Sequence, residues 1–371
     1  MGAGTSELTC CARDMGLGSR LLRLEQVAAA TPLHRNPNVS AGLLLWASEL
    51  RLVLAGPARP SGQGQEQEEW GLEQPDNGSA ASSSVNCKTA SQVAAYDLWS
   101  AAAAWSAGTP VEELLCMAWL PRRRLLLCGG AGIKEVCALD DQQHVSWSLD
   151  SHIGKVRCLA WASERELALC AGGQEVVAFS VDGLAEQPGW EPLWLTNTEF
   201  LELFSLEWAA SKELVFAGGS HNRAIQGKVA ALGIQAGETR WTSMPPIGAV
   251  LCLVWAEEHN LLFCGGNHAK VAALEPEKGD MVWSTDPGVG ESRHFGVYVN
   301  PGVTCLAWAR ASGLLICGGG AGRVAALDPT GGSLLWAVDL EVGALRSLAY
   351  VFEMGTTLCS GASGMVAALV T

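Results

Sequence analysis

The apolar positions of this chain recur in short runs, and the runs themselves repeat. An apolar run that ends in an aromatic residue is followed by four or five polar residues. A second run then ends in a pair of glycines, a third reads V-A-A-L or similar, and a fourth carries another tryptophan. Short apolar runs separated by turn residues predict β-strands joined in hairpins. Each repeat therefore predicts one four-stranded antiparallel sheet.

The repeat occurs seven times, most clearly from Val303 (VTCLAWARASGLLICGGGAGRVAALDPTGGSLLW). The first-strand aromatics are Trp46, Trp119, Trp161, Trp208, Trp255, Trp308 and Tyr350, and the fourth-strand tryptophans are Trp105, Trp147, Trp241, Trp283 and Trp336. Repeats of about 40–50 residues are typical of propeller blades, whose sheets bury their apolar faces against their neighbours. The sequence thus predicts an all-β fold, a seven-bladed β-propeller, in which these tryptophans are structural.

The domain organisation follows from what lies outside the repeat. Residues 1–18 are predicted to be a flexible tail, and residues 19–371 the propeller. Residues 60–92, rich in Ser, Gln, Glu, Gly and Asn, are predicted to be a disordered insertion in blade 1. The last repeat has no fourth strand, so residues 19–25 are predicted to complete it and to cover an unpaired edge. The alternative is an independent N-terminal strand or helix.

Charge and composition narrow the class of partner. The formal net charge of −14 at pH 7 argues against nucleic acid, because an acidic chain repels a phosphate backbone. The residues after Met1 do not resemble a signal peptide, and no run has the length needed to cross a bilayer. A cytoplasmic location is expected, with membrane association as the alternative, and the 13 cysteines are expected to be reduced.

Eight cysteines form four pairs on the first and second strands: Cys116/Cys128, Cys158/Cys170, Cys252/Cys264 and Cys305/Cys317. Disulfides or metal ligands are one interpretation. The spacing differs from that of C-x-x-C zinc sites, no histidine repeats with the pairs, and Ser205 or Ala217 takes the same place elsewhere. We therefore expect small packing residues, and neither a metal nor a cofactor is predicted.

The segment from Val303 to Asp328 resembles a WD-repeat unit. The residues that fit are Thr304, Ala307-Trp308 and Gly318-Gly319, with Leu327-Asp328 in place of the family's Trp-Asp. His152 stands where the family's histidine would, whereas the turn aspartate is replaced by Ala321. The resemblance implies a propeller that serves as a protein–protein interaction scaffold, as a subunit of a larger complex.

The second half of each unit resembles a quinoprotein (pyrroloquinoline quinone) repeat, with Ala-x-Asp, then Gly, then Trp ten residues after the Ala. The matching sets are Ala326, Asp328, Gly332 and Trp336; Ala273, Gly279 and Trp283; Ala231, Gly237 and Trp241; and Ala95, Asp97 and Trp105. The resemblance implies that these tryptophans dock one blade onto the next. Together the two resemblances cover roughly residues 40–371.

A quinone-dependent dehydrogenase is the rival function. It would need a bound cofactor, a metal held by oxygen ligands and a carboxylate base. Such enzymes are exported and generally have eight blades, whereas this sequence shows seven repeats and no isolated carboxylate cluster. H-E-x-x-H, P-loop and G-x-S-x-G motifs are also missing. The chain is therefore expected not to be an enzyme.

The N-terminus suggests a second alternative, a lipid-anchored adaptor at a membrane surface. Residues 1–6 match the M-G-x-x-x-[ST] pattern for myristoylation of Gly2, and Cys10 and Cys11 are candidates for palmitoylation. Two lipids give a stable anchor, whereas one binds weakly. An ordinary unmodified N-terminus is the other interpretation.

Other proteins are the predicted partners, bound by loops between blades and by turns between second and third strands. The candidate residues are His152, Lys155, Phe200, His221, Asn222, Arg223, His268, His294, Phe295 and Tyr298. Exposed aromatic side chains among polar ones suit an interaction hot spot. Packing of Phe295 and Tyr298 onto their own loop is the alternative.

Overall fold

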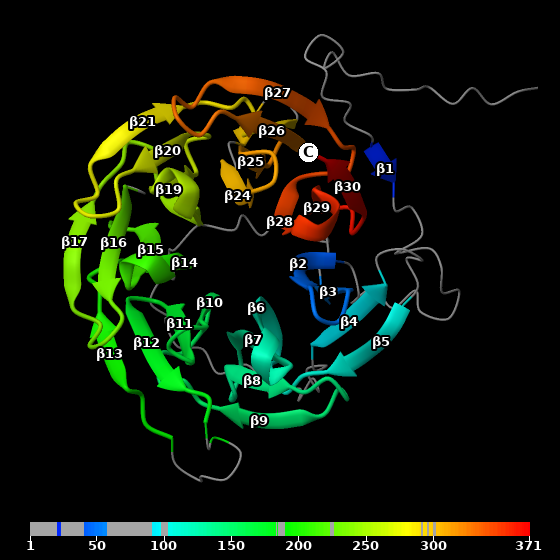
Figure 1. Cartoon of the computed structure of the whole chain (residues 1–371), viewed down its shortest axis with the longest axis vertical. Helices are drawn as coiled ribbons and strands as arrows, with labels where there is room; N and C mark the ends of the chain where they lie inside the picture. The colour runs from blue at the N-terminus through cyan, green and yellow to red at the C-terminus, as the bar shows by residue number, and fades with distance from the viewer. Residues whose placement is uncertain are drawn as a thin grey trace, which may run out of the picture.

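Seven four-stranded antiparallel sheets stand side by side in a ring (Figure 1). The computed structural model describes residues 21–23, 41–57, 91–97, 103–182, 184, 190–222, 226–290, 292–294, 297–299 and 302–371. The first strand of each sheet lies nearest the axis of the ring and the fourth lies at the rim. The predicted all-β, seven-bladed propeller is confirmed.

The blades follow one another in chain order. Blade 1 comprises β2 (Ala41–Ala47), β3 (Leu52–Pro57), β4 (Gln92–Asp97) and β5 (Ala103–Gly108); blade 2, β6 (Glu113–Leu120), β7 (Leu125–Ala131), β8 (Val136–Leu139) and β9 (Val145–Leu149); blade 3, β10 (Cys158–Ala162), β11 (Leu167–Gly172), β12 (Glu175–Ser180) and β13 (Trp194–Asn197). Blade 4 comprises β14 (Glu202–Ala209), β15 (Leu214–Ser220), β16 (Gly227–Gly233) and β17 (Thr239–Ser243); blade 5, β18 (Val250–Ala256), β19 (Leu261–Gly266), β20 (Val271–Leu274) and β21 (Met281–Thr285). Blade 6 comprises β24 (Val303–Ala309), β25 (Leu314–Gly319), β26 (Arg323–Leu327) and β27 (Leu334–Asp339); blade 7, β28 (Leu345–Val351), β29 (Thr356–Gly361), β30 (Val366–Val370) and β1 (Leu21–Arg23). A separate hairpin, β22 (Ser292–His294) with β23 (Val297–Val299), lies between blades 5 and 6 in the sequence.

The N-terminal strand closes the ring as predicted. β1 pairs antiparallel with β30, with Leu21 opposite Leu369 and Arg23 opposite Ala367. This pairing gives blade 7 its fourth strand and covers the edge of β30 that would otherwise be open to another chain. The predicted tail at residues 1–18 lies outside the described residues, as does the predicted insertion at residues 60–92 apart from its last two residues, of which Gln92 begins β4.

The hydrophobic core is divided among the seven junctions between blades. Each cluster of buried apolar side chains draws on two consecutive blades, and the seventh joins blade 7 to blade 1 through Leu358, Ala368 and Leu44. A four-stranded sheet alone leaves both of its faces in water, so each blade depends on its neighbours for burial.

The paired glycines are required by close contact between backbones. A Cβ on Gly130 would lie 1.8 Å from the Glu113 carbonyl oxygen, and one on Gly219 would lie 2.1 Å from that of Glu202. Among the paired glycines, only Gly173 also has a positive φ, at +53°. Any larger residue would therefore push the second strand away from the start of the first.

The first-strand tryptophans reach back to the preceding blade. Four of their indole nitrogens donate to a glutamate that lies three residues after the first-strand aromatic residue of the preceding blade: Trp119 Nε1 to Glu49 Oε2 (2.9 Å), Trp208 to Glu164 (3.0 Å), Trp308 to Glu258 (3.0 Å) and Trp46 to Glu353 (3.1 Å). A carboxylate acceptor makes these bonds stronger than bonds between neutral groups. We call this contact the Trp–Glu clamp.

Three blades lack the clamp glutamate and carry Arg122, Ser211 or Ala311 at that position. At Ala311 the backbone N–H donates instead to the Tyr350 hydroxyl of blade 7, at 3.2 Å. At Ser211 nothing replaces the carboxylate. The buried Nε1 of Trp255, which would donate to it, has no hydrogen-bond partner among the described residues. The junction between blades 4 and 5 therefore keeps an unsatisfied donor, which lowers stability.

The fourth-strand tryptophans reach forward to the next blade. Trp241 Nε1 donates to the Pro276 carbonyl oxygen at 2.7 Å and Trp283 Nε1 to that of Pro329 at 2.9 Å. The rings pack against Gly279 and Gly332 in the same turns, where a Cβ would lie about 2.5 Å from ring carbons. Trp194 makes the same contact with Ile234 (2.8 Å), although the sequence pattern missed it because a long loop after β12 alters the spacing.

Replacing Ser211 with glutamate should restore the missing clamp. Ser211 is exposed, so the longer side chain has room, and its carboxylate would accept from Trp255 Nε1. We expect the free energy of unfolding to rise by roughly 1 kcal/mol, the net value of one such bond. Chemical denaturation of S211E beside the wild type measures this change.

The matched control is E258A, which removes a clamp that is present. It should lower the free energy of unfolding by roughly 1–2 kcal/mol, since it leaves Trp308 Nε1 without an acceptor. If E258A is destabilising and S211E has no effect, the missing carboxylate is not the defect at the junction of blades 4 and 5.

Candidate functional site: the loop face and the central channel

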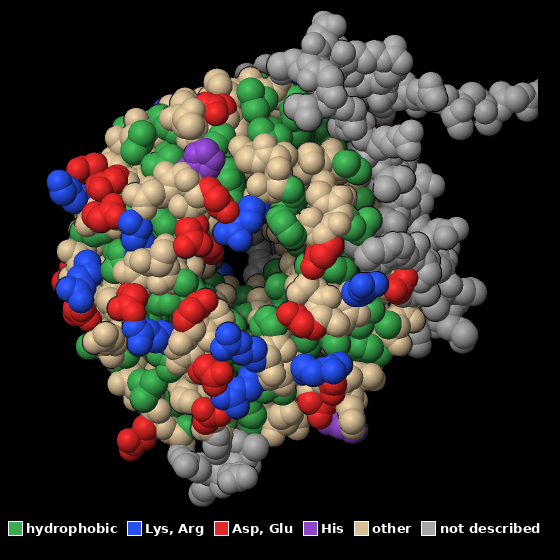
Figure 2. All heavy atoms as spheres, in the orientation of Figure 1, with side chains coloured by type: hydrophobic (Ala, Val, Ile, Leu, Met, Phe, Trp, Pro, Cys, Tyr) green, Lys and Arg blue, Asp and Glu red, His purple; other side chains and the backbone are tan. Residues whose placement is uncertain are grey.

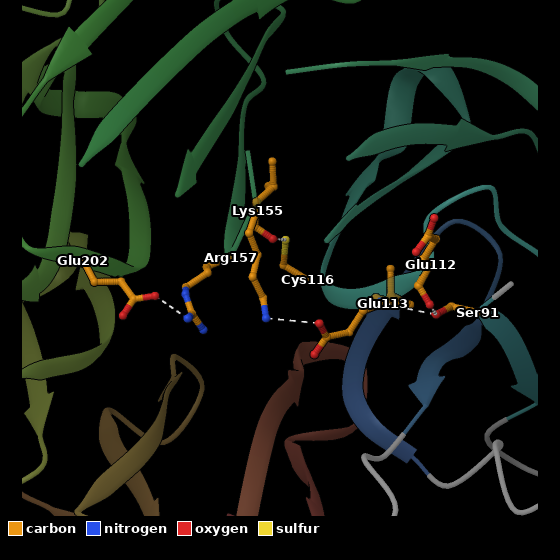
Figure 3. A network of polar contacts seen from close by, with 9 residues as sticks. Ser91, Glu112, Glu113, Cys116, Lys155, Arg157 and Glu202 are labelled. Atoms are coloured by element: carbon orange, nitrogen blue, oxygen red, sulfur yellow. Dashed lines mark hydrogen bonds and ion pairs between the residues drawn. The ribbon is translucent and has the colours of Figure 1, made fainter. Parts of the chain in front are cut away.

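One end of the ring is formed by the connections between blades and by the turns between second and third strands; we call it the loop face. At the channel mouth on this face, Lys155 Nζ lies 3.1 Å from Glu113 Oε2, and Arg157 forms an ion pair with Glu202 (Figure 3). The Arg157 guanidinium also lies over the Phe204 ring, 5.7 Å from its centroid. These contacts link blades 2, 3 and 4 around the mouth.

The charges around the channel are mixed in sign. Figure 2 shows the opening at the centre of one face, with acidic and basic side chains interspersed around it. A mixed rim gives no strong field of one sign, so it favours recognition by individual pairs of groups over attraction of a polyanion.

The predicted residues His152 and Lys155 lie in the same connection between blades 2 and 3. The His152 ring stacks on Trp190 with centroids 5.6 Å apart and planes 6° from parallel, and its Nδ1 lies 3.5 Å from Asp150 Oδ1. The His152 side chain remains 60% exposed. The stacking holds an exposed imidazole in a defined position, which lowers the entropy lost when a partner binds.

The expectation for Phe200 is wrong. Its side chain is 1% exposed and belongs to the core between blades 3 and 4. The Lys228 ammonium lies 5.0 Å from the centroid of the ring and donates to the Thr198 carbonyl oxygen at 2.9 Å. The buried Phe200 side chain therefore holds its loop against the core between blades 3 and 4. The sequence does not reveal that Phe200 is buried, because Phe200 adjoins the exposed Leu201 and its burial depends on the neighbouring blade.

The other candidates are spread over blades 4 and 5 and the loop that follows. His221 and Asn222 are partly buried: His221 Nδ1 has no hydrogen-bond partner among the described residues, and Asn222 Nδ2 donates to Gln226 Oε1 at 3.2 Å. His268 is exposed in the corresponding turn of blade 5. The backbones of His294 and Tyr298 form β22 and β23, but their side chains lie outside the described part of the chain, as do Arg223, Phe295, Gly2, Cys10 and Cys11.

Two exposed apolar residues of the loop face escaped the sequence analysis. Ile133 is 80% exposed in the turn between β7 and β8, and Leu201 is 37% exposed in the connection between blades 3 and 4. Strongly exposed aliphatic side chains in loops are candidate anchors for a partner. The neighbouring residues in the sequence, Gly-Ile-Lys and Phe-Leu-Glu, contain no pattern that distinguishes an exposed aliphatic side chain from a buried one.

A carboxyl group lies between the innermost strands of blades 4 and 5, at a position that is apolar in the other blades. Glu207 of β14 directly precedes the blade tryptophan, and the equivalent residues of the other blades are Leu45, Ala118, Ala160, Val254, Ala307 and Ala349. Glu207 Oε1 accepts a hydrogen bond from the Trp255 backbone N–H at 3.2 Å. The side chain keeps some contact with solvent but is surrounded closely by protein, and this burial raises the pKa of Glu207 to about 7.

A pocket of about 330 Å³ opens between blades 4 and 5, away from the loop face. Its lining includes Lys212, Arg240, Trp241 and Glu277. Lys212 pairs with Glu277 and Arg240 with Glu238, so the charges of the pocket are already compensated. Trp241 is held by its hydrogen bond to the next blade. The lysine, arginine and tryptophan of the pocket are thus already engaged in contacts within and between the two blades.

The ten cysteines of the described residues are all free and buried. Cys116 and Cys128 illustrate why the pairs form no cross-strand bridge, since Cys116 faces Gly129 and Cys128 faces Met117 in the strand register. Burial raises the pKa of Cys158 and of Cys305 to about 12. The expectation that these cysteines serve packing is consistent with this environment.

Neither a family model nor a curated protein matches this chain. Over the described ranges, the structure has no group of three or more His, Cys, Asp or Glu side chains placed to hold a metal ion. In the same residues, no helical segment has the length and apolar character needed to span a bilayer.

The raised pKa of Glu207 predicts a pH-dependent stability. Between its ordinary value of 4.5 and about 7, the folded state holds a proton that the unfolded state has lost, so stability falls as pH rises. Relative to E207Q, which keeps the hydrogen-bond acceptor, the wild type should lose stability from pH 5 to pH 8. Denaturation curves of both proteins at each pH unit give the difference, and the exposed E191Q serves as control. Parallel curves for wild type and E207Q would show that Glu207 titrates normally.

The buried cysteines should resist alkylation. With a pKa of about 12, on the order of one in ten thousand Cys158 or Cys305 thiols is ionised at pH 8, and neither is accessible. We expect iodoacetamide to leave the ten described cysteines unmodified in native protein and to modify all of them in guanidinium chloride, as read by peptide mass spectrometry. Rapid native modification of Cys158 or Cys305 would contradict the structure.

Proposed function

We propose that this chain is a non-catalytic protein-interaction scaffold of the WD-repeat type, acting as one subunit of a larger assembly through its loop face. The observation that carries the proposal is the unequal use of the two ends of the ring. The docking contacts of the tryptophans gather at the turns between first and second strands and between third and fourth strands. None of these five bonds involves the loop face, where Trp190 Nε1 donates instead to the Asp150 carbonyl oxygen and the other loops are left for partners.

The loop face also has the composition of a binding surface. Exposed Ile133 and Leu201 are flanked by polar side chains, and the stacked His152 and the Lys155–Glu113 pair hold directional groups in place. A few apolar anchors surrounded by polar groups supply most of the affinity in protein interfaces. The net charge of −14 favours basic proteins as partners.

The WD-repeat resemblance of the first half of each repeat supports this function. The tryptophan contacts implied by the quinoprotein resemblance are also present, but they join blade to blade and so serve the architecture. They support a propeller fold and bring no reactive group to a common point, which favours the scaffold over the dehydrogenase.

The test is affinity purification with quantitative mass spectrometry from cells that express the wild type or a variant. I133D and L201D place a charge on the loop face, and we expect each to weaken recovery of specific partners about tenfold or more. The matched control is F352D, because Phe352 is 59% exposed at the opposite end of the ring. Variants that unfold are recognised beforehand by circular dichroism.

The results separate the two ends of the ring. Recovery lost with I133D or L201D and kept with F352D supports the proposal. Partners that are kept by both loop-face variants and lost with F352D would place binding at the other end and contradict it.

A further inference from the structure

The charged residues at the start of the third strands divide the loop face into two parts of opposite sign. Each directly precedes the first valine of its third strand, and in blades 2 to 6 they are Glu135, Glu175, Lys228, Lys270 and Arg323. The sign therefore changes between blades 3 and 4. On the basic side, Lys228 Nζ donates to the Thr198 carbonyl oxygen at 2.9 Å and Arg323 to that of Gly288 at 3.0 Å, so these cations hold the preceding connection in place.

A glutamate at this position cannot donate to a carbonyl oxygen, because an ionised carboxylate only accepts hydrogen bonds. Glu135 accepts from the Ser151 backbone N–H at 2.8 Å instead. The partly exposed side chain of Glu175 has no hydrogen bond or ion pair within the described part of the chain. Glu175 lies opposite Asn197 in the strand register, where the connection between blades 3 and 4 begins. It leaves an uncompensated carboxylate at the edge of that connection.

A second carboxylate projects from the same connection. Asn197 Oδ1 accepts from the Glu199 backbone N–H at 3.0 Å, and the turn gives Glu199 a φ of +56°. In the connection between blades 5 and 6 the same turn holds Gly288 at +67°, and this conformation favours glycine over glutamate. The exposed Glu199 side chain also has no partner among the residues that the structure describes.

The basic side chains of this region are engaged by other acids, so they do not neutralise Glu175 and Glu199. The pairs are Lys155 with Glu113, Arg157 with Glu202 and, by electrostatic interaction, Lys134 with Asp150. We call this part of the loop face the acidic sector; it comprises residues 131–135, 150–157, 173–175 and 197–202.

Exposed aliphatic side chains lie at both ends of the acidic sector. Ile133 is in the turn of blade 2, and Leu201 follows Glu199 by two residues. The connection between them is hydrogen-bonded to β7 through the Val156 N–H and to β11 through the Arg157 N–H, so the surface is continuous from blade 2 to blade 3. Uncompensated carboxylates between aliphatic anchors fit a segment that carries both cations and apolar side chains.

We propose that the acidic sector binds a short, extended basic segment of a partner protein. Lysine or arginine side chains of that segment would pair with Glu175 and Glu199, and its aliphatic side chains would contact Ile133 and Leu201. The inference rests on the proposed function and specifies the chemistry of the partner. Nucleic acid and anionic lipid are disfavoured as occupants, because the carboxylates repel their phosphate groups.

A peptide selection tests this site before any partner is identified. Random twelve-residue peptides displayed on phage are selected on full-length wild-type protein, and the enriched peptides are sequenced. We expect lysine and arginine to be enriched together with leucine, isoleucine, valine or methionine. The tightest enriched peptide, synthesised with a fluorescein label, is then the probe for binding measured by fluorescence anisotropy.

We expect E175Q and E199Q each to weaken binding of this peptide about threefold, and the double variant roughly tenfold, because each removes one exposed ion pair. Added salt should weaken binding to the wild type more than binding to the double variant. The matched control is D286N/D339N, which removes two exposed charges from the loop face beside blades 5 and 6 and keeps the oxygens that accept backbone bonds there. It should bind as the wild type does.

Three results would overturn the site: no enriched peptide, enriched peptides without basic residues, or equal binding by the wild type and E175Q/E199Q. Cellular partners that are lost with I133D or L201D but fully recovered with E175Q/E199Q would likewise contradict the basic segment and leave the scaffold function in place. Partners lost only with F352D would contradict the scaffold function whatever the peptides show. The two proposals can therefore fail separately.

Discussion

The structure depends on the contact by which each blade covers its neighbour. A single blade is a twisted sheet with two apolar faces, and it becomes stable only when a second sheet lies on each face. Tryptophan makes this contact specific, because its ring supplies apolar area while its N–H demands an acceptor at a defined point. Four inner tryptophans find that acceptor in the preceding blade and three outer ones find it in the next, as Trp208 and Trp241 of blade 4 illustrate.

The direction of these bonds divides the molecule into a structural end and an available end. Glu164 shows the effect on chemistry, since the hydrogen bond from Trp208 lowers the pKa of its carboxyl and keeps it ionised as an acceptor. The same bond commits the turn that holds Glu164 to the architecture. Loop residues such as Ile133 make no such contact with a neighbouring blade's tryptophan, which leaves them free to vary with the partner.

In blades 2 to 7 a small residue, cysteine or serine, lies three positions before the first-strand aromatic residue, whereas blade 1 has Leu43 there. Cys116 Sγ lies 3.8 Å from the Val156 carbonyl oxygen of the next blade, and Ser205 Oγ accepts from the Leu253 backbone N–H at 3.1 Å. Both side chains are short and contact the adjacent first strand, so either cysteine or serine fits there. The regular spacing of the cysteines therefore reflects the repeat and needs no disulfide or metal.

The amino-acid sequence alone determined the fold, the number of blades and the strand that closes the ring. Each repeat contains the same local features, which are short apolar runs, a glycine pair and tryptophans at fixed spacing. These features predict the strands and turns of one blade. Burial and pairing between blades were decided by the tertiary structure. Phe200 looks like any loop aromatic until blade 4 covers it, and Glu164 looks like a solvated turn residue until Trp208 reaches it. Glu207 becomes unusual only when blade 5 packs beside it and buries its carboxyl group, because a pattern read along one strand contains no information about what faces it from the next blade.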